Sequence, residues 1–528
     1  MFKNICNRKP VINRNVFYSV SAYYSRNYSK AQIQSEDPEW STAKPFSSVP
    51  GPSKIDLVFA FMPGGKYHNK PLKEIQSMCR KDYGELLIFP GMFGKRDILI
   101  SFNPEDYHKI FRTEGAMPVR RGLDTLTYYR KVLRKEVFKD MGGLVAEQGE
   151  KWAQFRTVVN PVMMQAPKVK QYIPKIDGVA IDFINRIRQI RNNETNEMPA
   201  NFEEELNRWA LESVGLVALD ARLGLLTEST VTAQRCIQSL KVFFRLMFEL
   251  DFQPSLWKIY PTRKYKELMK ALDVMTETTG EYLELAKAKL ERKIDVNGNQ
   301  GEADSVLQKL LKVDPHIAHI MAMDLILAGV DTTCSSIVSC LFMLGRNPNK
   351  QRILREEIKT ILPDDNSTLT GVAMNSLPYL RACIKESFRI CPVSIANFRT
   401  TGKNIVLSGY QVPKGVDVVM ANMVLLTDEN IFPRSAEFIP ERWLRKTTEE
   451  YPSASTAKPF VFLPFGFGPR MCIGRRFAEV EIEVLLCRLI RNFVVEWNYP
   501  DIQFKSNVIN VPQGELKFKF TDVNESQK

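Results

Sequence analysis

One cysteine of this chain lies in a run of residues that suits a thiolate metal ligand. The run Phe-Gly-Phe-Gly-Pro-Arg-Met-Cys-Ile-Gly ends at Gly474, and Cys472 comes just before a segment with the pattern of a helix. The free N–H groups and the positive dipole at the start of a helix stabilise a thiolate. Gly468 and Gly474 allow close backbone approach with unusual dihedral angles. Arg470 can pair with a cofactor carboxylate, and Phe465 can shield the sulfur from water. We therefore predict that Cys472 binds the metal of a cofactor.

A polar hexapeptide interrupts a long apolar segment. Residues 328–333 read Ala-Gly-Val-Asp-Thr-Thr. Asp314 is an N-cap followed by Pro315 at the first helical position, so we predict a helix from there to about Gly345, roughly 45 Å long at ~1.5 Å per residue. Glycine beside an acid and a hydroxyl in mid-helix is locally unfavourable, and such violations are expected at functional sites. The candidate site residues of this hexapeptide are Gly329, Asp331 and Thr332.

The rest of the chain predicts mostly helices with a few short strands. Two β-rich runs flank a glycine-containing loop and predict a hairpin over 85–102. From Gly149 onward the pattern is mostly helical. Besides the long helix, we expect helices over 104–111, 350–361, 377–391 and from about 473, and strands over 404–407 and 416–420. No repeat or linker divides the chain, so the predicted fold class is mainly α with a small β-region, in a single domain.

The composition is that of a large globular protein. The chain has 528 residues, of which 44% are apolar, and 73 basic against 60 acidic side chains give a net charge of +13. No block of lysine and arginine interleaved with aromatic residues appears, which argues against nucleic acid as a partner. The nine cysteines include no Cys-x-x-Cys pair, which indicates a reducing compartment.

The amino terminus is typical of a mitochondrial presequence. Residues 1–35 hold six basic side chains and no acid, and they lack the apolar core of a secretory signal. Arg26 lies three residues before Ser29, which matches the pattern of the matrix peptidase. We therefore predict a presequence over 1–28 and a mature domain over 29–528; a disordered basic tail is the alternative. No run reaches the ~18 apolar residues that a membrane-spanning helix needs.

The cysteine run and the motifs before it resemble those of the cytochrome P450 family. The resemblance covers essentially everything after the presequence, with the motifs in the family's order. It implies the cytochrome P450 fold with haem b as the cofactor and Cys472 as the proximal ligand of the iron, where thiolate donation favours O–O cleavage. It also implies that Gly329 leaves room for O₂, that Thr332 hydrogen-bonds the dioxygen, and that Asp331 helps to relay protons.

The resemblance also gives roles to charged and aromatic residues. Glu386 and Arg389 lie three apart on one helical face and, with Arg442, match a buried triad that has a structural role in the family. Trp152 and Arg156 lie four apart and share a face from which both reach a haem propionate. The predicted cofactor-binding residues are Cys472, Trp152, Arg156, Arg399, Arg470 and Phe465.

Within the family, the chain resembles the mitochondrial branch, in which a 2Fe–2S ferredoxin delivers the electrons. That branch docks the acidic ferredoxin on basic residues near the cysteine, and ordinary surface charges are the alternative interpretation. The family commonly has lysine where Arg381 stands, so the contact geometry there differs. The aromatic-rich segment 242–260 lies where the family has its substrate-access lid, and we expect it to touch the matrix side of the inner membrane peripherally. The expected ferredoxin-docking residues are Arg381, Lys385, Arg475 and Arg476.

Four stretches resemble insect cytochrome P450 family 12, a group associated with the oxidation of foreign compounds. We therefore predict a monooxygenase that inserts one atom of O₂ into a lipophilic foreign compound of insecticide type, with Val393 and Ile395 as substrate contacts. An ecdysteroid hydroxylase, an O₂-independent isomerase or dehydratase, and a non-catalytic haem-binding protein are the alternatives. The stretches are residues 61–67, 111–115, 120–125 and 160–165.

Overall fold

The structure is a computed structural model that describes residues 37–92, 94–227, 231–297, 305–364, 367–445 and 450–523. At 232, 233 and 289–297 it describes only the backbone. The predicted presequence over 1–28 lies outside the described residues.

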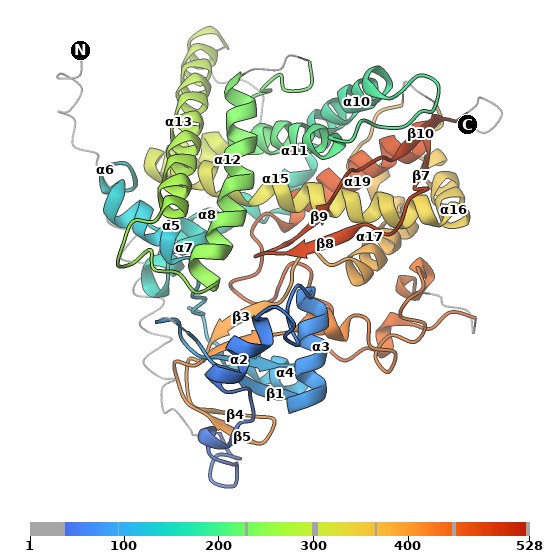
Figure 1. Ribbon diagram of the computed structural model, residues 1–528. Coiled ribbons are helices and arrows are strands. Elements are labelled where there is room, and N and C mark those ends of the chain that lie inside the picture. Colours follow the sequence, from blue (N-terminus) through green and yellow to red (C-terminus); the bar gives the residue numbers. More distant parts are fainter. Residues whose placement is uncertain are drawn as a thin grey trace.

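One long helix runs through the middle of the molecule. This helix, α15, spans Pro315–Arg346, and the side chain of its N-cap, Asp314, accepts the His316 N–H at 2.7 Å. Both predicted ends are confirmed to within about one residue, and Figure 1 shows the helix crossing the molecule. Within the described residues, α15 alone is long and apolar enough to span a bilayer, but 78% of its most apolar window is buried inside the molecule. It is therefore the core helix.

Other helices pack around α15 and bury one face each, as the predicted mainly α class requires. Helices further out show the same pattern: in α10, which packs on α11 and α19, the buried residues recur every three or four positions, so one stripe faces the core. The helices that contact α15 are α7 (Gly143–Ala146), α11 (Phe202–Ala218), α12 (Val231–Met247), α13 (Arg263–Asn297), α14 (Val306–Val313), α16 (Pro348–Lys359), α17 (Pro378–Ile390) and α19 (Arg475–Asn492). The others are α2 (Lys54–Phe61), α3 (Leu72–Tyr83), α4 (Pro104–Thr113), α5 (Asp124–Tyr128), α6 (Lys135–Phe138), α8 (Gly149–Met163), α9 (Ala166–Lys170), α10 (Ile173–Ile190) and α18 (Asn422–Leu425).

The small β-region is built on the predicted hairpin. Strands β1 (Leu86–Phe89) and β2 (Ile98–Ser101) pair antiparallel, β6 (Asp417–Met420) joins β2 in parallel, and β3 (Asn397–Thr400) pairs antiparallel with β6. The order β1-β2-β6-β3 leaves β3 at the edge of the sheet. The two-stranded sheets pair β4 (Ile405–Leu407) with β5 (Tyr410–Val412), β7 (Phe493–Glu496) with β10 (Lys519–Asp522), and β8 (Gln503–Ser506) with β9 (Asn510–Gln513).

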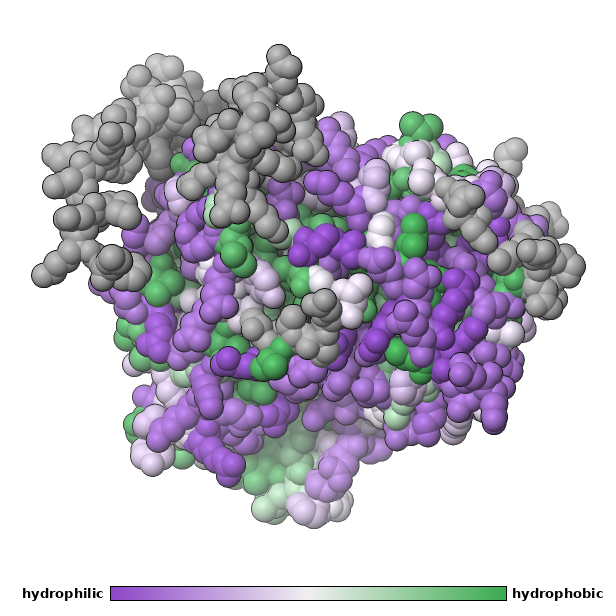
Figure 2. Space-filling view, turned by 90° about the horizontal axis from the view of Figure 1, so that it is seen from above, coloured by the Kyte–Doolittle hydropathy of each residue, from purple (hydrophilic) through white to green (hydrophobic). Residues whose placement is uncertain are grey.

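Two hydrophobic cores meet at the segment that carries Cys472. The larger core surrounds α15, and the smaller one fills the space between the four-stranded sheet and helices α2 to α4. Phe465 packs against the larger core, Phe467 against the smaller one, and Phe462 against both. On the face seen from above, hydrophobic residues lie scattered among polar ones (Figure 2). The cysteine segment therefore takes its position from both cores.

Candidate active site

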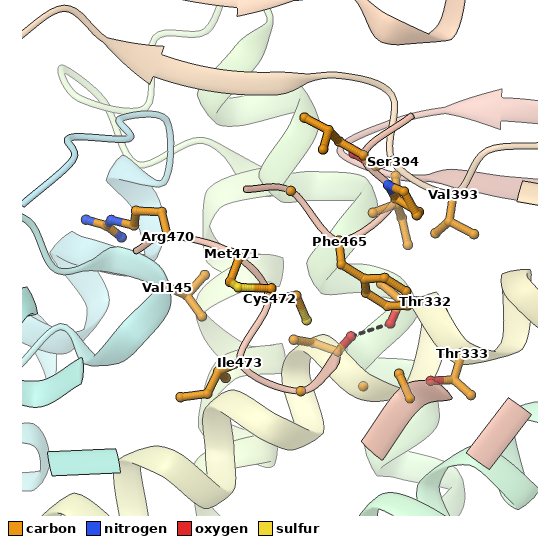
Figure 3. Close-up of a pocket in the computed structure, with 18 of the residues that line it drawn as sticks. Val145, Thr332, Thr333, Val393, Ser394, Phe465, Arg470, Met471, Cys472 and Ile473 are labelled. Carbon is orange, nitrogen blue, oxygen red and sulfur yellow. Dashed lines mark hydrogen bonds between the residues drawn. The ribbon is translucent and has the colours of Figure 1, made fainter. Parts of the chain in front are cut away.

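A cavity of about 400 Å³ brings most of the predicted site residues together. Its walls come from α8, α15, β3, the segment after α17, and the loop before α19, and they are mainly apolar. Figure 3 shows part of this lining. Of the predicted catalytic and cofactor-binding residues, those that line the cavity are Gly329, Thr332, Trp152, Arg156, Arg399, Phe465, Arg470 and Cys472.

The loop before α19 holds Cys472 by its own backbone. The Cys472 N–H donates to the Phe465 carbonyl at 2.9 Å, and the Met471 N–H donates to the Gly468 carbonyl at 3.0 Å. Gly466 and Gly468 have φ of +71° and +74°, which favours glycine at both positions. The predicted unusual dihedral at Gly474 is wrong, since its φ is −80°. The backbone N–H of Gly474 instead donates a hydrogen bond to the Cys472 sulfur.

The surroundings of Cys472 act on its thiol in two opposite directions. Burial raises the pKa of the Cys472 thiol, while the N–H groups of Gly474 and Arg475 and the charges of Arg156 and Arg120 oppose that rise. Helix α19 begins at Arg475, so its positive end faces the sulfur as predicted. A thiolate here gains from metal coordination, because burial alone disfavours its charge.

Four guanidinium groups line the cavity together, and we call them the arginine cluster: Arg120, Arg156, Arg399 and Arg470. Burial lowers the pKa of Arg470 to about 8, and the charges of Arg120, Arg399 and Arg156 act in the same direction. Burial likewise lowers the pKa of Arg120 and of Arg156 to about 10. So many buried cations call for anions, and the two carboxylates of a haem satisfy that need.

The individual contacts support this fit. Arg470 donates to the carbonyls of Pro118 at 3.0 Å and Glu147 at 2.6 Å, and it lies over the Trp152 ring with 4.2 Å to the centroid. Arg156 donates to the Met471 carbonyl at 3.0 Å, but its buried Nε has no partner among the described residues. That orphaned donor is available to a propionate.

Sequence reasoning missed Arg120. It noted the stretch 120–125 only as a regional resemblance, and the neighbouring Arg121 is a surface residue that pairs with Asp417 at 3.2 Å. Gln148 holds Arg120 in place, because its side-chain amide donates to the Arg120 carbonyl at 2.7 Å. The Gln148 oxygen accepts a hydrogen bond from Arg470 at 2.6 Å. No local pattern in the sequence reveals contacts between such distant positions.

On α15, adjacent residues of the hexapeptide face different ways. Thr332 lines the cavity, and its hydroxyl donates to the Ala328 carbonyl at 2.6 Å (Figure 3). Asp331 does not line the cavity; it is 8% exposed and lies near Glu203 and Lys241. Burial raises the pKa of Asp331 to about 7, and the charge of Glu203 adds to the rise.

Gly329 has a packing reason as well as a place in the cavity wall. A Cβ at this position would lie 2.8 Å from Val214 on α11, so glycine lets the two helices approach closely. The structure thus gives a cause for Gly329 other than the predicted space for O₂.

Of the two predicted substrate contacts, Val393 lines the cavity, whereas Ile395 packs with Ala396 in a small separate core.

The predicted triad forms completely. Glu386 accepts hydrogen bonds from Arg389 at 2.8 and 2.9 Å and from Arg442 at 2.9 Å. It also accepts the Ile439 N–H at 3.1 Å and the Trp443 indole N–H at 2.8 Å. None of the three charged side chains is exposed. The triad therefore joins α17 to the short 3-10 helix Pro440–Trp443.

The four basic residues expected to dock a ferredoxin differ in how free they are. Arg381 pairs with Glu483 at 2.9 Å and Arg475 with Glu479 at 2.9 Å. Lys385 is exposed and lies over the Trp443 ring, with 5.8 Å to the centroid. Arg476 is exposed and has no ion-pair partner among the described residues.

The aromatic residues of segment 242–260 mostly belong to the core rather than to a surface cluster. Phe243, Phe244 and Trp257 are buried, and Phe252 packs on Phe398 of β3 at a centroid distance of 6.1 Å. Composition alone does not separate a core face from a surface patch. The exposed apolar residues of the segment are Leu256, Ile259 and Tyr260.

Comparison with known proteins agrees with this geometry. A sequence model of the cytochrome P450 family matches residues 49–520. The chain is 45% identical over 507 residues to cytochrome P450 CYP12A2 of Musca domestica, covering 94% of each chain. It is 43% identical over 526 residues to probable mitochondrial cytochrome P450 12a5 of Drosophila melanogaster, covering 98% of this chain and 97% of the relative. It is 42% identical over 520 residues to mitochondrial cytochrome P450 12b1 of Drosophila acanthoptera, covering 97% and 96%.

These matches extend over nearly the whole of each relative, and two of the three carry a mitochondrial name. They agree with the mainly α fold described above. The chain therefore belongs to the cytochrome P450 family, within the insect family 12 group of mitochondrial members, and is a haem-iron monooxygenase.

Proposed function

We propose that this monooxygenase hydroxylates lipophilic foreign compounds on the matrix side of the inner mitochondrial membrane, with electrons from a 2Fe–2S ferredoxin. The mainly apolar lining of the cavity, beside both Cys472 and Thr332, is the observation that supports it most directly. Such a lining favours lipophilic molecules, because few of its groups can replace water around a polar substrate.

The residues around the cavity suit haem b. Cys472 would supply the axial ligand, Phe465 would cover the sulfur, and the arginine cluster with Trp152 would hold the propionates. The chain has no Cys-x-x-Cys-His run that could attach a haem covalently. When bound, the haem iron supplies the oxygen-activating chemistry of the family.

Two adjacent residues of α15 would deliver protons. The Thr332 hydroxyl holds a proton inside the cavity, and Asp331 lies on the side of the helix that faces Glu203 and Lys241. Those two residues form a partly exposed ion pair at 3.4 Å, so this side of the helix lies near solvent, from which Asp331 would take up its proton. Because burial raises the pKa of Asp331 to about 7, this carboxyl can both take up and release a proton near neutral pH.

Replacing Thr332 with alanine is expected to separate electron consumption from product formation. The hydroxyl that holds a proton in the cavity is lost, so we expect the fraction of electrons recovered in product to fall about tenfold while peroxide rises. Product and peroxide are measured against the reductant consumed. Ser339→Ala is the control, because Ser339 makes the same kind of bond, to the Ser335 carbonyl at 2.9 Å, outside the cavity lining. Unchanged coupling in Thr332→Ala would refute the relay.

Arg476 offers the sharpest test of the ferredoxin partner. We expect Arg476→Glu to raise the KM for a mitochondrial ferredoxin about tenfold and to weaken its salt dependence, since a free basic charge becomes an acidic one. Lys54→Glu, the same change at an exposed position on α2, is expected to leave the KM unchanged. Equal effects in the two variants would argue against docking at Arg476.

The substrate class is tested by titrating the haem absorption spectrum. We expect several unrelated lipophilic foreign compounds to shift the band, because the apolar cavity selects by solubility and shape. A tight response to one ecdysteroid precursor alone would replace the proposal with a hydroxylase of hormone synthesis. Turnover without reductant or O₂ would point to an isomerase or dehydratase. Haem binding with no turnover of any compound would indicate a non-catalytic protein.

Contact with the membrane would come from the tip of segment 242–260. Leu256, Ile259 and Tyr260 are 57%, 86% and 66% exposed. Exposed apolar residues beside a buried aromatic base suit a shallow insertion among lipid headgroups. This part of the proposal rests on those three side chains rather than on the aromatic cluster predicted from the sequence.

A further inference from the structure

Glu114 is a buried acid that the mechanism above does not use. It is the C-cap residue of α4, and its side chain is 2% exposed. Its Oε2 accepts a hydrogen bond from Arg399 Nε. Arg399 also donates to the carbonyls of Phe398 at 2.9 Å and Phe467 at 2.8 Å. Glu114 thus holds the guanidinium of Arg399, which lines the cavity, although Glu114 is not part of the lining.

The second carboxylate oxygen of Glu114 faces the cysteine loop. Oε1 is buried without a hydrogen-bond partner among the described residues, and a Cβ on Gly468 would lie 2.3 Å from it. A glutamine would accept the bond from Arg399 equally well and would carry no charge into the interior. The feature that distinguishes the acid here is therefore its negative charge, beside the loop that carries Cys472.

Glu114 brings the total charge around the haem closer to zero, and to zero in the ferrous state. The arginine cluster contributes +4, and the two propionates with the Cys472 thiolate contribute −3. The iron–porphyrin core is +1 when ferric and neutral when ferrous. With Glu114 at −1, the buried set totals +1 in the ferric state and 0 in the ferrous state. Without Glu114 the totals are +2 and +1.

The other acids at the cavity do not change this count. Asp324 lines the cavity but pairs with the buried Arg130 at 2.7 Å, so these two charges cancel. Glu147 pairs with Lys131 at 2.8 Å, so the two charges cancel. Glu481 lines the cavity, and burial raises its pKa to about 8, so it is mostly neutral at pH 7. Burial raises the pKa of Glu114 too, but the neighbouring charges of Arg399 and Arg470 oppose the rise and favour the carboxylate.

We propose that Glu114 is a positioning residue that lowers the reduction potential of the haem, by fixing Arg399 and cancelling part of the charge of the arginine cluster. Reduction adds one electron to the buried set, and a more positive set favours that electron. Glu114 therefore makes the ferric state harder to reduce than the four guanidiniums alone would allow. It sets the driving force for the first electron that the redox partner must supply.

The test is a redox titration of the purified full chain loaded with haem, followed by the haem absorption bands without substrate or ferredoxin. We expect Glu114→Gln to make reduction about tenfold more favourable, which for one electron is a shift of ~59 mV to more positive potential. Glu105→Gln is the matched control, because Glu105 lies on the same helix, is 65% exposed and pairs with Lys458 at 3.2 Å. Its effect on the reduction equilibrium is expected to stay below about twofold.

Glu114→Asp separates charge from geometry. It keeps the negative charge and shortens the reach to Arg399, so we expect a potential within about twofold of the parent protein even if haem is held more loosely. A full-sized shift in Glu114→Asp, or no shift in Glu114→Gln beyond that of Glu105→Gln, would overturn the proposal. If Glu114→Gln does not retain haem, Glu114→Asn is compared with Glu114→Asp, because these two side chains have nearly the same shape and differ in charge, and the same tenfold difference is expected between them. Neither readout depends on the substrate or on the redox partner.

Discussion

Replacing Cys472 with serine is expected to abolish monooxygenase activity, by at least ~10³-fold, and to remove the absorption signature of a thiolate-bound haem. A serine hydroxyl is neutral near pH 7 and donates far less electron density to iron than a thiolate does. The structure stabilises the anion at this position through the Gly474 N–H and the charge of Arg156, and a neutral oxygen makes little use of either. The measurement is the spectrum of the ferrous carbon monoxide complex, with turnover determined alongside.

The control for this substitution is another cysteine outside the cavity. Cys391 is half-buried and does not belong to the cavity lining. Cys391→Ser should therefore keep both the spectrum and the turnover, apart from a small loss of stability. Retention of the thiolate signature in Cys472→Ser would contradict the assigned ligand.

Replacing Glu386 with alanine is expected to leave almost no folded protein. The carboxylate satisfies Arg389 and Arg442, and neither arginine has any exposed side-chain surface. Removing one partner of a buried ion pair costs ~3–5 kcal/mol, because the other charge stays buried without compensation. Here one deletion strands two cations, so the loss approaches the whole stability of ~5–15 kcal/mol that is typical of a protein.

Soluble yield, bound haem and urea unfolding measure this effect. Glu356→Ala is the control, because Glu356 pairs with Lys359 at 3.0 Å but is 57% exposed. Its loss should cost less than ~1 kcal/mol. A folded Glu386→Ala protein with parental stability would show that the two arginines are neutralised by groups other than the triad carboxylate.

Local patterns predicted the helices, the hairpin and the loop around Cys472 well. The cap at Asp314 fixes the start of α15, and the glycine-containing loop fixes the hairpin, because both depend on neighbouring residues alone. The loop around Cys472 is likewise a local structure held by its own backbone bonds. These features follow from sequence because few distant residues are needed to form them.

Residues that act through distant contacts were harder to predict. Gln148 holds Arg120 at the cavity, and Glu114 acts on the cavity through its hydrogen bond with Arg399. No spacing rule connects such positions. Asp331 is different, since helix geometry places adjacent residues about 100° apart, so it was predictable that Asp331 and Thr332 would not share a face. Side-chain direction on α15 could thus have been derived from the sequence before the structure was known.

The cysteine loop packs with Phe465 on one core and with Phe467 on the other. The loop that carries Cys472 therefore depends on the packing of both cores. A loss of packing in the β-region alone would therefore shift this loop and weaken haem binding while the helices stay folded. The fraction of protein that retains haem therefore reports on the packing between the two cores. When the β-region is destabilised, this fraction should decline before the helical circular dichroism signal does.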